Sequence, residues 1–81
     1  MQSDRDKLTE MVGARIRSLR SARGLSIDAL AASSEINPTY LGRIERGEKC
    51  PTLDTLDKVS MGLGLPLALH GGLMRRQAAA A

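Results

Sequence analysis

Two helix starts, eleven residues apart, constrain this chain more than any other feature of its sequence. Ser26 and Asn37 are both residues that favour helix N-caps, and Pro38 follows in the first helical position, where proline is favoured. An apolar residue precedes each cap and another lies four residues beyond it, the spacing of a hydrophobic staple: Leu25 with Leu30, and Ile36 with Leu41. The sequence from Ser34 to Asn37 leaves room only for a tight turn, so the pattern predicts two short helices meeting at an angle.

A further helix is expected on each side of this pair. The segment Leu8–Arg23 has helical apolar periodicity, with Ser3 as a candidate cap and Gly24 at its end. Its apolar face comprises Leu8, Val12, Ile16 and Leu19. Gly47 ends the third helix, and Thr52 caps a fourth after Pro51. The fourth helix is expected to bury Leu53, Leu56, Val59 and Leu63.

Composition favours the same all-α class. The sequence has no Phe or Trp, and Tyr40 is its only aromatic residue, which suits close helix packing better than a β-sandwich. We therefore predict a compact domain of four to five helices over residues 8–70, followed by a tail, residues 71–81, that contributes to dimerisation and then frays. Alternating leucines slightly favour a short strand over Leu65–Leu69, although a helical turn from Pro66 remains an alternative.

Several functional classes are disfavoured. No apolar run approaches the roughly 20 residues that span a membrane, and the charged start lacks a signal-peptide stretch, so we expect a cytoplasmic protein with no membrane partner. The single Cys50 and the single His70 cannot form a disulfide or a structural zinc site, and we expect no metal or cofactor. Cys50 lies in a loop, where a lone cysteine is usually inert rather than a redox switch. No acid, base and nucleophile converge, which argues against an enzyme.

The charge is moderately basic. Twelve Lys and Arg against nine Asp and Glu give a net charge of +3. Arg15, Arg17, Arg20 and Arg23 form a run without an acidic residue, and a second basic group is interleaved with glutamates. Charge alone is more typical of solvated helix faces, but it is compatible with an anionic partner.

The third helix divides into two halves when it is projected at 100° per residue. Its packed half carries Tyr40, Leu41, Ile44 and Glu45, and its outward half carries Thr39, Gly42, Arg43 and Arg46. The small Ala31 on the second helix allows the two helices to cross closely. A helix with hydroxyl and guanidinium groups on its outward half fits the major groove of DNA.

Residues Gly13–Leu65 resemble the Xre-type Cro/repressor helix-turn-helix domain of phage and bacterial regulators. The most telling stretch is Leu25–Leu56, with its Leu-Ala pair, its Ile-Glu-Arg-Gly ending of the third helix and its Pro-Thr-Leu opening of the fourth. The resemblance implies that double-stranded DNA is the partner, that Thr39 and Arg43 read base edges, and that Arg20 and Glu45 form a structural ion pair. The residues expected to contact phosphate or to position the domain are Ser26, Asn37, Tyr40, Arg46 and Lys49.

Three positions depart from the family pattern. Ile27 stands where a polar Gln is frequent, and Pro38 stands where a second base-reading side chain is frequent, so DNA shape is expected to carry more of the specificity. Glu35 occupies the turn position usually held by glycine and must adopt a left-handed backbone at a cost of about 1 kcal/mol. Tyr40 is expected at the edge of the packed half with its hydroxyl outward.

These residues predict a prokaryotic or phage-encoded transcriptional regulator, most simply a dimeric repressor. A single domain makes few base contacts, so a two-fold dimer on a palindrome with half-sites about 10 bp apart, or a multiple of that, is expected. The expected dimer surface is Leu65–Met74. The alternatives are an antitoxin that represses its own operon and a controller protein of a restriction–modification system. Their candidate protein partners are a toxin or RNA polymerase.

Overall fold

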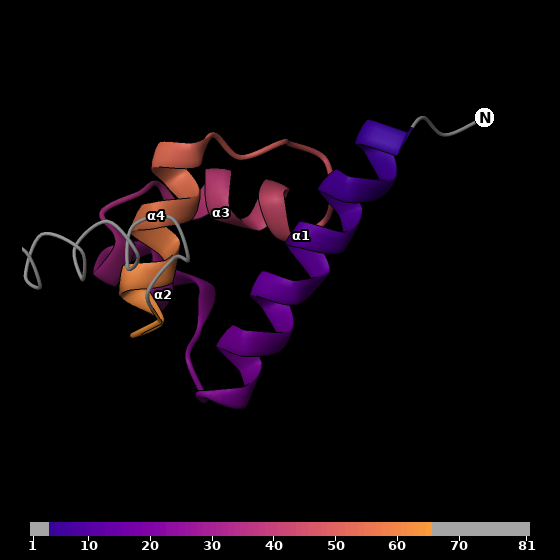
Figure 1. The fold of residues 1–81 in the computed structure, drawn as a ribbon. Coiled ribbons are helices and arrows are strands. Elements are labelled where there is room, and N and C mark those ends of the chain that lie inside the picture. The colour runs from indigo at the N-terminus through magenta and orange to yellow at the C-terminus, as the bar shows by residue number, and fades with distance from the viewer. Residues whose placement is uncertain (1–3, 66–81) are drawn as a thin grey trace, which may run out of the picture.

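A computed structural model describes residues 4–65, which form four helices in the order α1, α2, α3 and α4 (Figure 1). The helices are α1 (Asp4–Ala22), α2 (Ile27–Ser34), α3 (Pro38–Glu45) and α4 (Leu53–Gly62). No strand occurs within residues 4–65, and the expected all-α architecture is confirmed. The predicted Ser3 cap, the tail at residues 71–81 and the Leu65–Leu69 strand, apart from Leu65 itself, lie outside the described residues.

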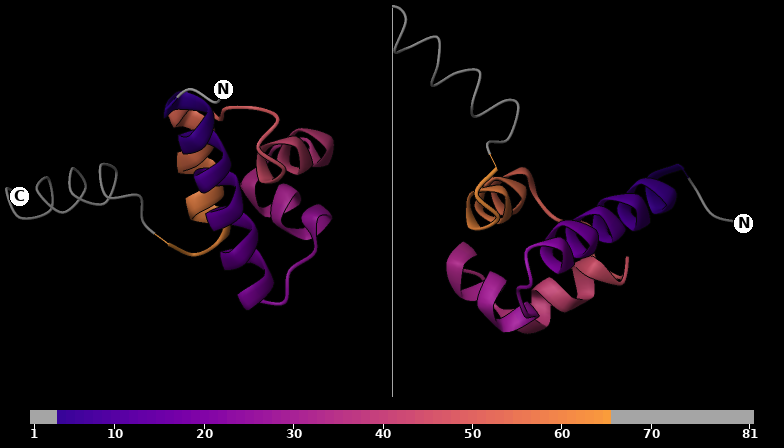
Figure 2. Two further views of the ribbon diagram at one scale, coloured as in Figure 1. Left: turned by 90° about the vertical axis from the view of Figure 1, so that its right-hand side faces the viewer. Right: turned by 90° about the horizontal axis from the view of Figure 1, so that it is seen from below.

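The helices pack as two contacting pairs around one core. α1 packs against α3, α2 packs against α4, and α2 also contacts α3 across the short turn between them. Figure 2 shows α1 and α3 side by side when the molecule is seen from below. Four apolar side chains are almost completely enclosed by these contacts: Leu30, Leu41, Ile44 and Val59. The long α1 therefore packs against the buried half of α3.

Three of the predicted helix caps are confirmed. The Oγ of Ser26 accepts a hydrogen bond from the N–H of Ala29 at 3.0 Å. The Oδ1 of Asn37 accepts from the N–H groups of Thr39 at 2.8 Å and Tyr40 at 3.3 Å. The Oγ1 of Thr52 accepts from the N–H of Thr55 at 3.1 Å. Each cap satisfies a donor that the helix itself leaves unpaired, and so fixes where its helix begins.

Two of the predicted apolar faces extend too far. The first helix begins at Asp4, where a cap at Ser3 would start it, but Leu8 is 58% exposed because it borders an open hollow beside α1 while the neighbouring Thr9 is buried. Leu53, expected in the core, is 70% exposed. It occupies the first turn of α4 and lies about 120° around the helix from the buried Val59. Thr55 is buried in that turn instead.

Gly13 allows α1 and α3 to approach closely. A Cβ atom added there would collide with the carbonyl oxygen of Ile44, and it would lie 3.0 Å from that of Glu45. Both contacts are with backbone, which cannot rotate away. The position of α3 relative to α1 therefore depends on the absence of a side chain at residue 13.

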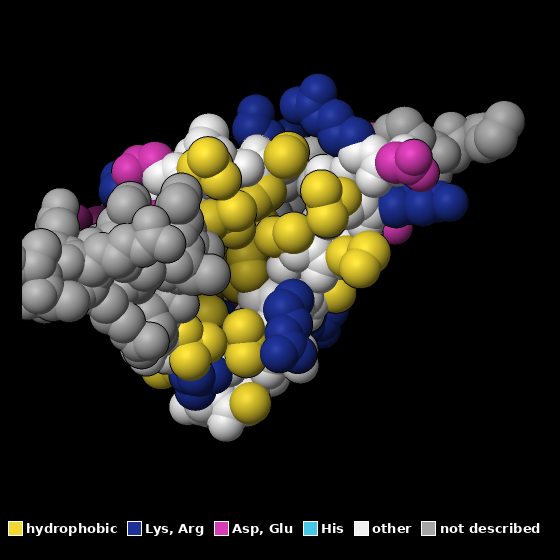
Figure 3. Space-filling view, in the orientation of Figure 1, with side chains coloured by type: hydrophobic (Ala, Val, Ile, Leu, Met, Phe, Trp, Pro, Cys, Tyr) yellow, Lys and Arg dark blue, Asp and Glu magenta, His cyan; other side chains and the backbone are white. Residues whose placement is uncertain are grey.

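An apolar hollow of about 400 Å³ lies between α1 and α4. It is lined by Leu8, Met11, Val12, Arg15, Ile16 and Leu56. Figure 3 shows apolar side chains gathered along this face. Among the described residues, no helix has the length and apolar character needed to cross a membrane.

Candidate nucleic-acid interface

The turn between α2 and α3 depends on a left-handed residue, as predicted. Glu35 has φ 58° and ψ 42°. Its N–H donates to the carbonyl oxygen of Ala32 at 3.2 Å, and the N–H of Ile36 donates to that of Ala31 at 3.0 Å. These bonds close the end of α2 and reverse the chain within a few residues. The capped start of α3 follows immediately at Asn37.

The two halves of α3 face as the periodicity predicts, except that Gly42, expected on the outward half, is buried beneath the side chain of Arg46. Leu41 and Ile44 are fully buried against the other helices. Thr39, Arg43 and Arg46 are exposed on the opposite half. Among residues 4–65, Arg43 forms no ion pair, so its guanidinium donors are available to a ligand. The described part of α3 therefore presents a hydroxyl and two guanidinium groups from a rigid helix.

The predicted phosphate and positioning residues lie around this face. Ser26 and Asn37 are exposed at the starts of α2 and α3, and Lys49 is exposed in the segment between α3 and α4. The Oγ of Ser26 is an acceptor in its cap, which leaves its O–H free to donate. These three side chains are thus accessible to a ligand, whereas Tyr40 is half-buried.

Tyr40 differs from the expectation that its hydroxyl points outward. The ring is half-buried, and the hydroxyl lies 3.3 Å from Oγ1 of Thr55 on α4. Thr55 also accepts from the hydroxyl of Thr52 at 3.0 Å. The reason is that α4 begins directly beside α3, so the hydroxyl meets a polar partner within the protein before it reaches solvent. Tyr40 thus ties α3 to α4.

Arg46 is the one basic residue of this group that forms an ion pair within the described residues. Its Nε donates to Oε2 of Glu48 at 2.5 Å, and both side chains are about half exposed. The hydrogen bond from Arg46 lowers the pKa of Glu48, as do the charges of Arg46 and Arg43. The same hydrogen bond raises the pKa of Arg46. An exposed pair of this kind is weak and gives way readily to a competing anion.

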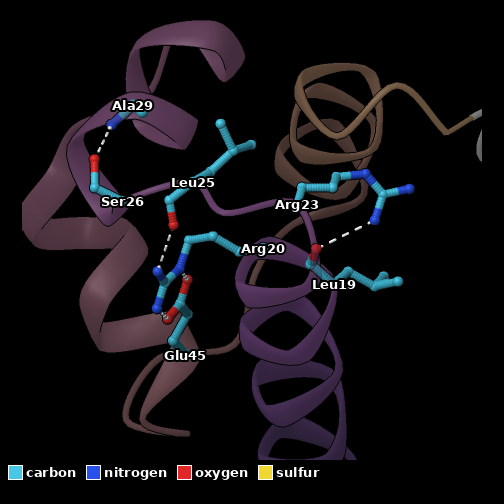
Figure 4. A network of polar contacts seen from close by, with 7 residues as sticks. All are labelled: Leu19, Arg20, Arg23, Leu25, Ser26, Ala29 and Glu45. Atoms are coloured by element: carbon cyan, nitrogen blue, oxygen red, sulfur yellow. Dashed lines mark hydrogen bonds and ion pairs between the residues drawn. The ribbon is translucent and has the colours of Figure 1, made fainter.

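The predicted pair of Arg20 and Glu45 is present (Figure 4). Arg20 donates from Nε and Nη2 to both carboxylate oxygens of Glu45, at 2.7 and 2.9 Å. Its Nη1 donates to the carbonyl oxygen of Leu25 at 2.8 Å. The hydrogen bonds with Glu45 raise the pKa of Arg20. All three guanidinium nitrogens are engaged within the protein, which supports a structural role.

The run of four arginines does not form one basic patch. Arg23 donates to the carbonyl oxygens of Leu63 at 2.8 Å and Leu19 at 3.2 Å, so it links the end of α1 to the end of α4. Arg15 borders the apolar hollow between α1 and α4. Arg17 lies beside α3, a position that its charge alone did not indicate. Its helical spacing of three from Arg20 is the signal that places it there.

The fold and this surface define a helix-turn-helix domain, with α3 in the place of the recognition helix. Residues 16–69 match the model of the Helix-turn-helix family HTH_3, and the chain belongs to that family. The family is one of transcription regulators, and the resemblance to Xre-type regulators is confirmed.

Three relatives illustrate the similarity. The restriction–modification controller protein C.AhdI from Aeromonas hydrophila has a TM-score of 0.69 and is 35% identical, covering 70% of this chain and 86% of that chain. The clp gene regulator ClgR from C. glutamicum has a TM-score of 0.71 and is 38% identical, covering 75% of this chain and 78% of that one. The transcriptional regulator SutR of Escherichia coli is 35% identical over 63 residues, 78% of this chain but 35% of SutR.

Proposed function

We propose that this chain regulates transcription by binding double-stranded DNA sequence-specifically as a homodimer, most simply as a repressor at a palindromic operator. The observation that carries the proposal is the outward half of α3. Its exposed Thr39 and Arg43 project from a helix whose opposite half is locked in the core. A rigid helix with these donors matches the dimensions and the hydrogen-bonding pattern of the major groove.

The proposal assigns a role to each exposed side chain. Arg43 would read a guanine edge through two donors, and Thr39 would contact a neighbouring base. The exposed Ser26, Asn37, Arg46 and Lys49 would contact the phosphates on either side of the groove. Tyr40 would act as a positioning residue through its contact with Thr55, and Arg20 and Glu45 would hold α3 against α1.

Dimerisation supplies the base contacts that one domain lacks. A repressor with a single α3 reads only a few base pairs, and a two-fold dimer doubles that number. The exposed apolar side chains of α1, with Leu8 58% and Met11 67% exposed, border the hollow between α1 and α4 and support a second candidate association surface beside the proposed dimer segment Leu65–Met74. Beyond Leu65, that segment lies outside the described residues.

Selection from a random duplex library at near-physiological salt tests the proposal. The expected result is enrichment of a two-fold symmetric site with half-sites about 10 bp apart, or a multiple of that. Retention of DNA without any motif would overturn sequence-specific regulation. Analytical ultracentrifugation at micromolar concentration, with and without the selected site, tests the dimer, which a monomer under both conditions would contradict.

The controller protein of a restriction–modification system is a second candidate. The similarity to C.AhdI covers 86% of that controller, whereas the similarity to SutR covers only 35% of SutR. If the chain is a controller, the gene beside its own encodes an endonuclease or a methyltransferase, and the selected site lies upstream of that gene. A toxin gene in that place would instead support the antitoxin alternative.

A further inference from the structure

A hollow of about 210 Å³ lies where α1, the start of α2 and α3 meet. It is lined by Arg17, Arg20, Ile27, Gly42, Glu45 and Arg46. Three of these six residues carry a guanidinium group and only one carries a carboxylate. Ile27 is the first residue of α2, so the hollow also lies beside a helix N-terminus, where the partial charge is positive.

The single carboxylate of the hollow is already fully used. Both oxygens of Glu45 accept from Arg20, and the remaining bonded nitrogen of Arg20 donates to Leu25 (Figure 4). Arg17 is exposed and makes no ion pair within residues 4–65. Arg46 is held only by the exposed Glu48. The hollow therefore retains two guanidinium groups whose donors are available to an anion.

Gly42 keeps the hollow open. Glycine weakens a helix interior relative to alanine, so its presence in the middle of the short α3 needs a local reason. A Cβ atom at this position would lie 3.1 Å from Nη1 and 3.9 Å from Cζ of Arg46. The guanidinium of Arg46 thus lies over the bare backbone of α3, and a side chain at residue 42 would displace it and fill part of the hollow.

We propose that a phosphate of the DNA backbone binds in this hollow, between Arg17 and Arg46 and against Gly42, and replaces Glu48 as the partner of Arg46. The inference rests on the proposed function, because it requires α3 to enter the major groove. Gly42 lies about 60° around α3 from Thr39, on the side away from Arg43. If Thr39 and Arg43 face the base edges, the side of α3 that carries Gly42 faces the phosphates that border the groove.

Arg15 provides a matched control for Arg17. The two residues are about 160° apart around α1, and Arg15 borders the apolar hollow on the other side. Binding of each variant is measured by fluorescence anisotropy over a range of salt, on the selected duplex and on a scrambled duplex. We expect Arg17→Gln to weaken binding to both duplexes about tenfold and to reduce the salt slope by about one. We expect Arg15→Gln to leave the slope unchanged.

Gly42→Ala gives an independent test because it removes no charge. We expect it to weaken binding to both duplexes while Tm is unchanged or raised, since alanine favours the helix and the displaced atoms are the end of a flexible side chain. Weaker binding with a lowered Tm would reflect unfolding and count against the inference.

The identity of the anion is tested with duplexes in which single phosphates are replaced by neutral methylphosphonates. At one position in each half-site, the replacement should lower the affinity of the wild type for the duplex. The affinity of Arg17→Gln should be the same with and without that replacement. The inference is overturned if no position shows this coupling, or if Arg17→Gln behaves as Arg15→Gln does.

Shifts in the NMR signals of Gly42 and Arg46 with inorganic phosphate, without such coupling, would instead assign the hollow to a free anion. A wild-type chain that binds neither duplex would overturn the proposed function as well.

Discussion

The side chains of Arg20 and Glu45 join α1 to α3 through two parallel hydrogen bonds, and the carboxylate of Glu45 is only 3% exposed. A buried carboxylate is costly unless its charge is paired and its oxygens are hydrogen-bonded. Arg20 provides both, from a side chain that is itself 14% exposed. Because Glu45 is the last residue of α3, the pair fixes the end of the helix that presents Arg43.

Arg20→Ala and Glu45→Ala are each expected to lower the free energy of unfolding by about 3 kcal/mol, because each leaves the other charge without its partner. The double variant should lose less than the sum of the two, and urea denaturation measures all three. Arg46→Ala, which breaks an exposed pair, should change stability by less than about 1 kcal/mol. Strict additivity of the Arg20 and Glu45 losses would show that the two side chains act independently.

Gly13→Ala is expected to destabilise the fold by about 2 kcal/mol or more, because its Cβ meets the backbone carbonyl of Ile44 and α1 must move away from α3. Gly42→Ala is the matched comparison, since its Cβ meets only the end of the Arg46 side chain. That variant should be as stable as the wild type or more stable by up to about 1 kcal/mol. Thermal unfolding followed by circular dichroism compares them, and equal changes in Tm would contradict the close approach at Gly13.

The features that sequence predicted well are local. The caps at Ser26, Asn37 and Thr52 each bond to an N–H within three residues, so neighbouring side chains decide them without reference to the rest of the fold. The left-handed conformation of Glu35 is local as well, because it depends on the backbone of that turn alone. The Arg20–Glu45 pair spans 25 residues, and the resemblance to a family predicted it where periodicity did not.

The features that sequence missed depend on where one helix ends relative to another. Leu8 continues the apolar face of α1, but it borders an open hollow opposite Leu56 of α4 and stays exposed. The hydroxyl of Tyr40 meets α4, whose placement no pattern within α3 encodes. Arg15 and Arg17 are two residues apart in the sequence, yet they border different hollows, because helical rotation separates them.

Glu35→Gly is expected to stabilise the domain by about 1 kcal/mol. Glu35 has φ 58°, where a Cβ atom is strained and glycine is not. Glu35→Ala is the control, because it removes the charge and keeps the Cβ, and it should change stability little. Urea midpoints measure both. A loss of stability in the glycine variant would mean that the flexibility it adds to the unfolded chain outweighs the relief of strain.

The pKa of Glu48 is expected to rise toward its ordinary value of 4.5 in Arg46→Gln, because the hydrogen bond from Arg46 is the main cause that lowers it. A lowered pKa in the folded state means that the ionised Glu48 stabilises the fold at pH values above its unfolded pKa. This contribution is lost as the pH falls through the lower, folded pKa. NMR titration of the side-chain carboxyl measures the pKa directly, and an unchanged value in the variant would show that the pair does not persist in solution.

Arg43→Ala is expected to lower affinity for the selected site by about 1–3 kcal/mol and to relax the preference at one base pair in each half-site, if its guanidinium pairs with a guanine edge. Lys49→Ala is the comparison, because Lys49 is exposed and is proposed to contact phosphate. It should weaken binding to every sequence alike and flatten the salt dependence. Repeating the library selection with each variant distinguishes the two roles. If both variants lose affinity equally on selected and scrambled DNA, Arg43 contacts only the backbone, and specificity resides in Thr39 and in the shape of the DNA.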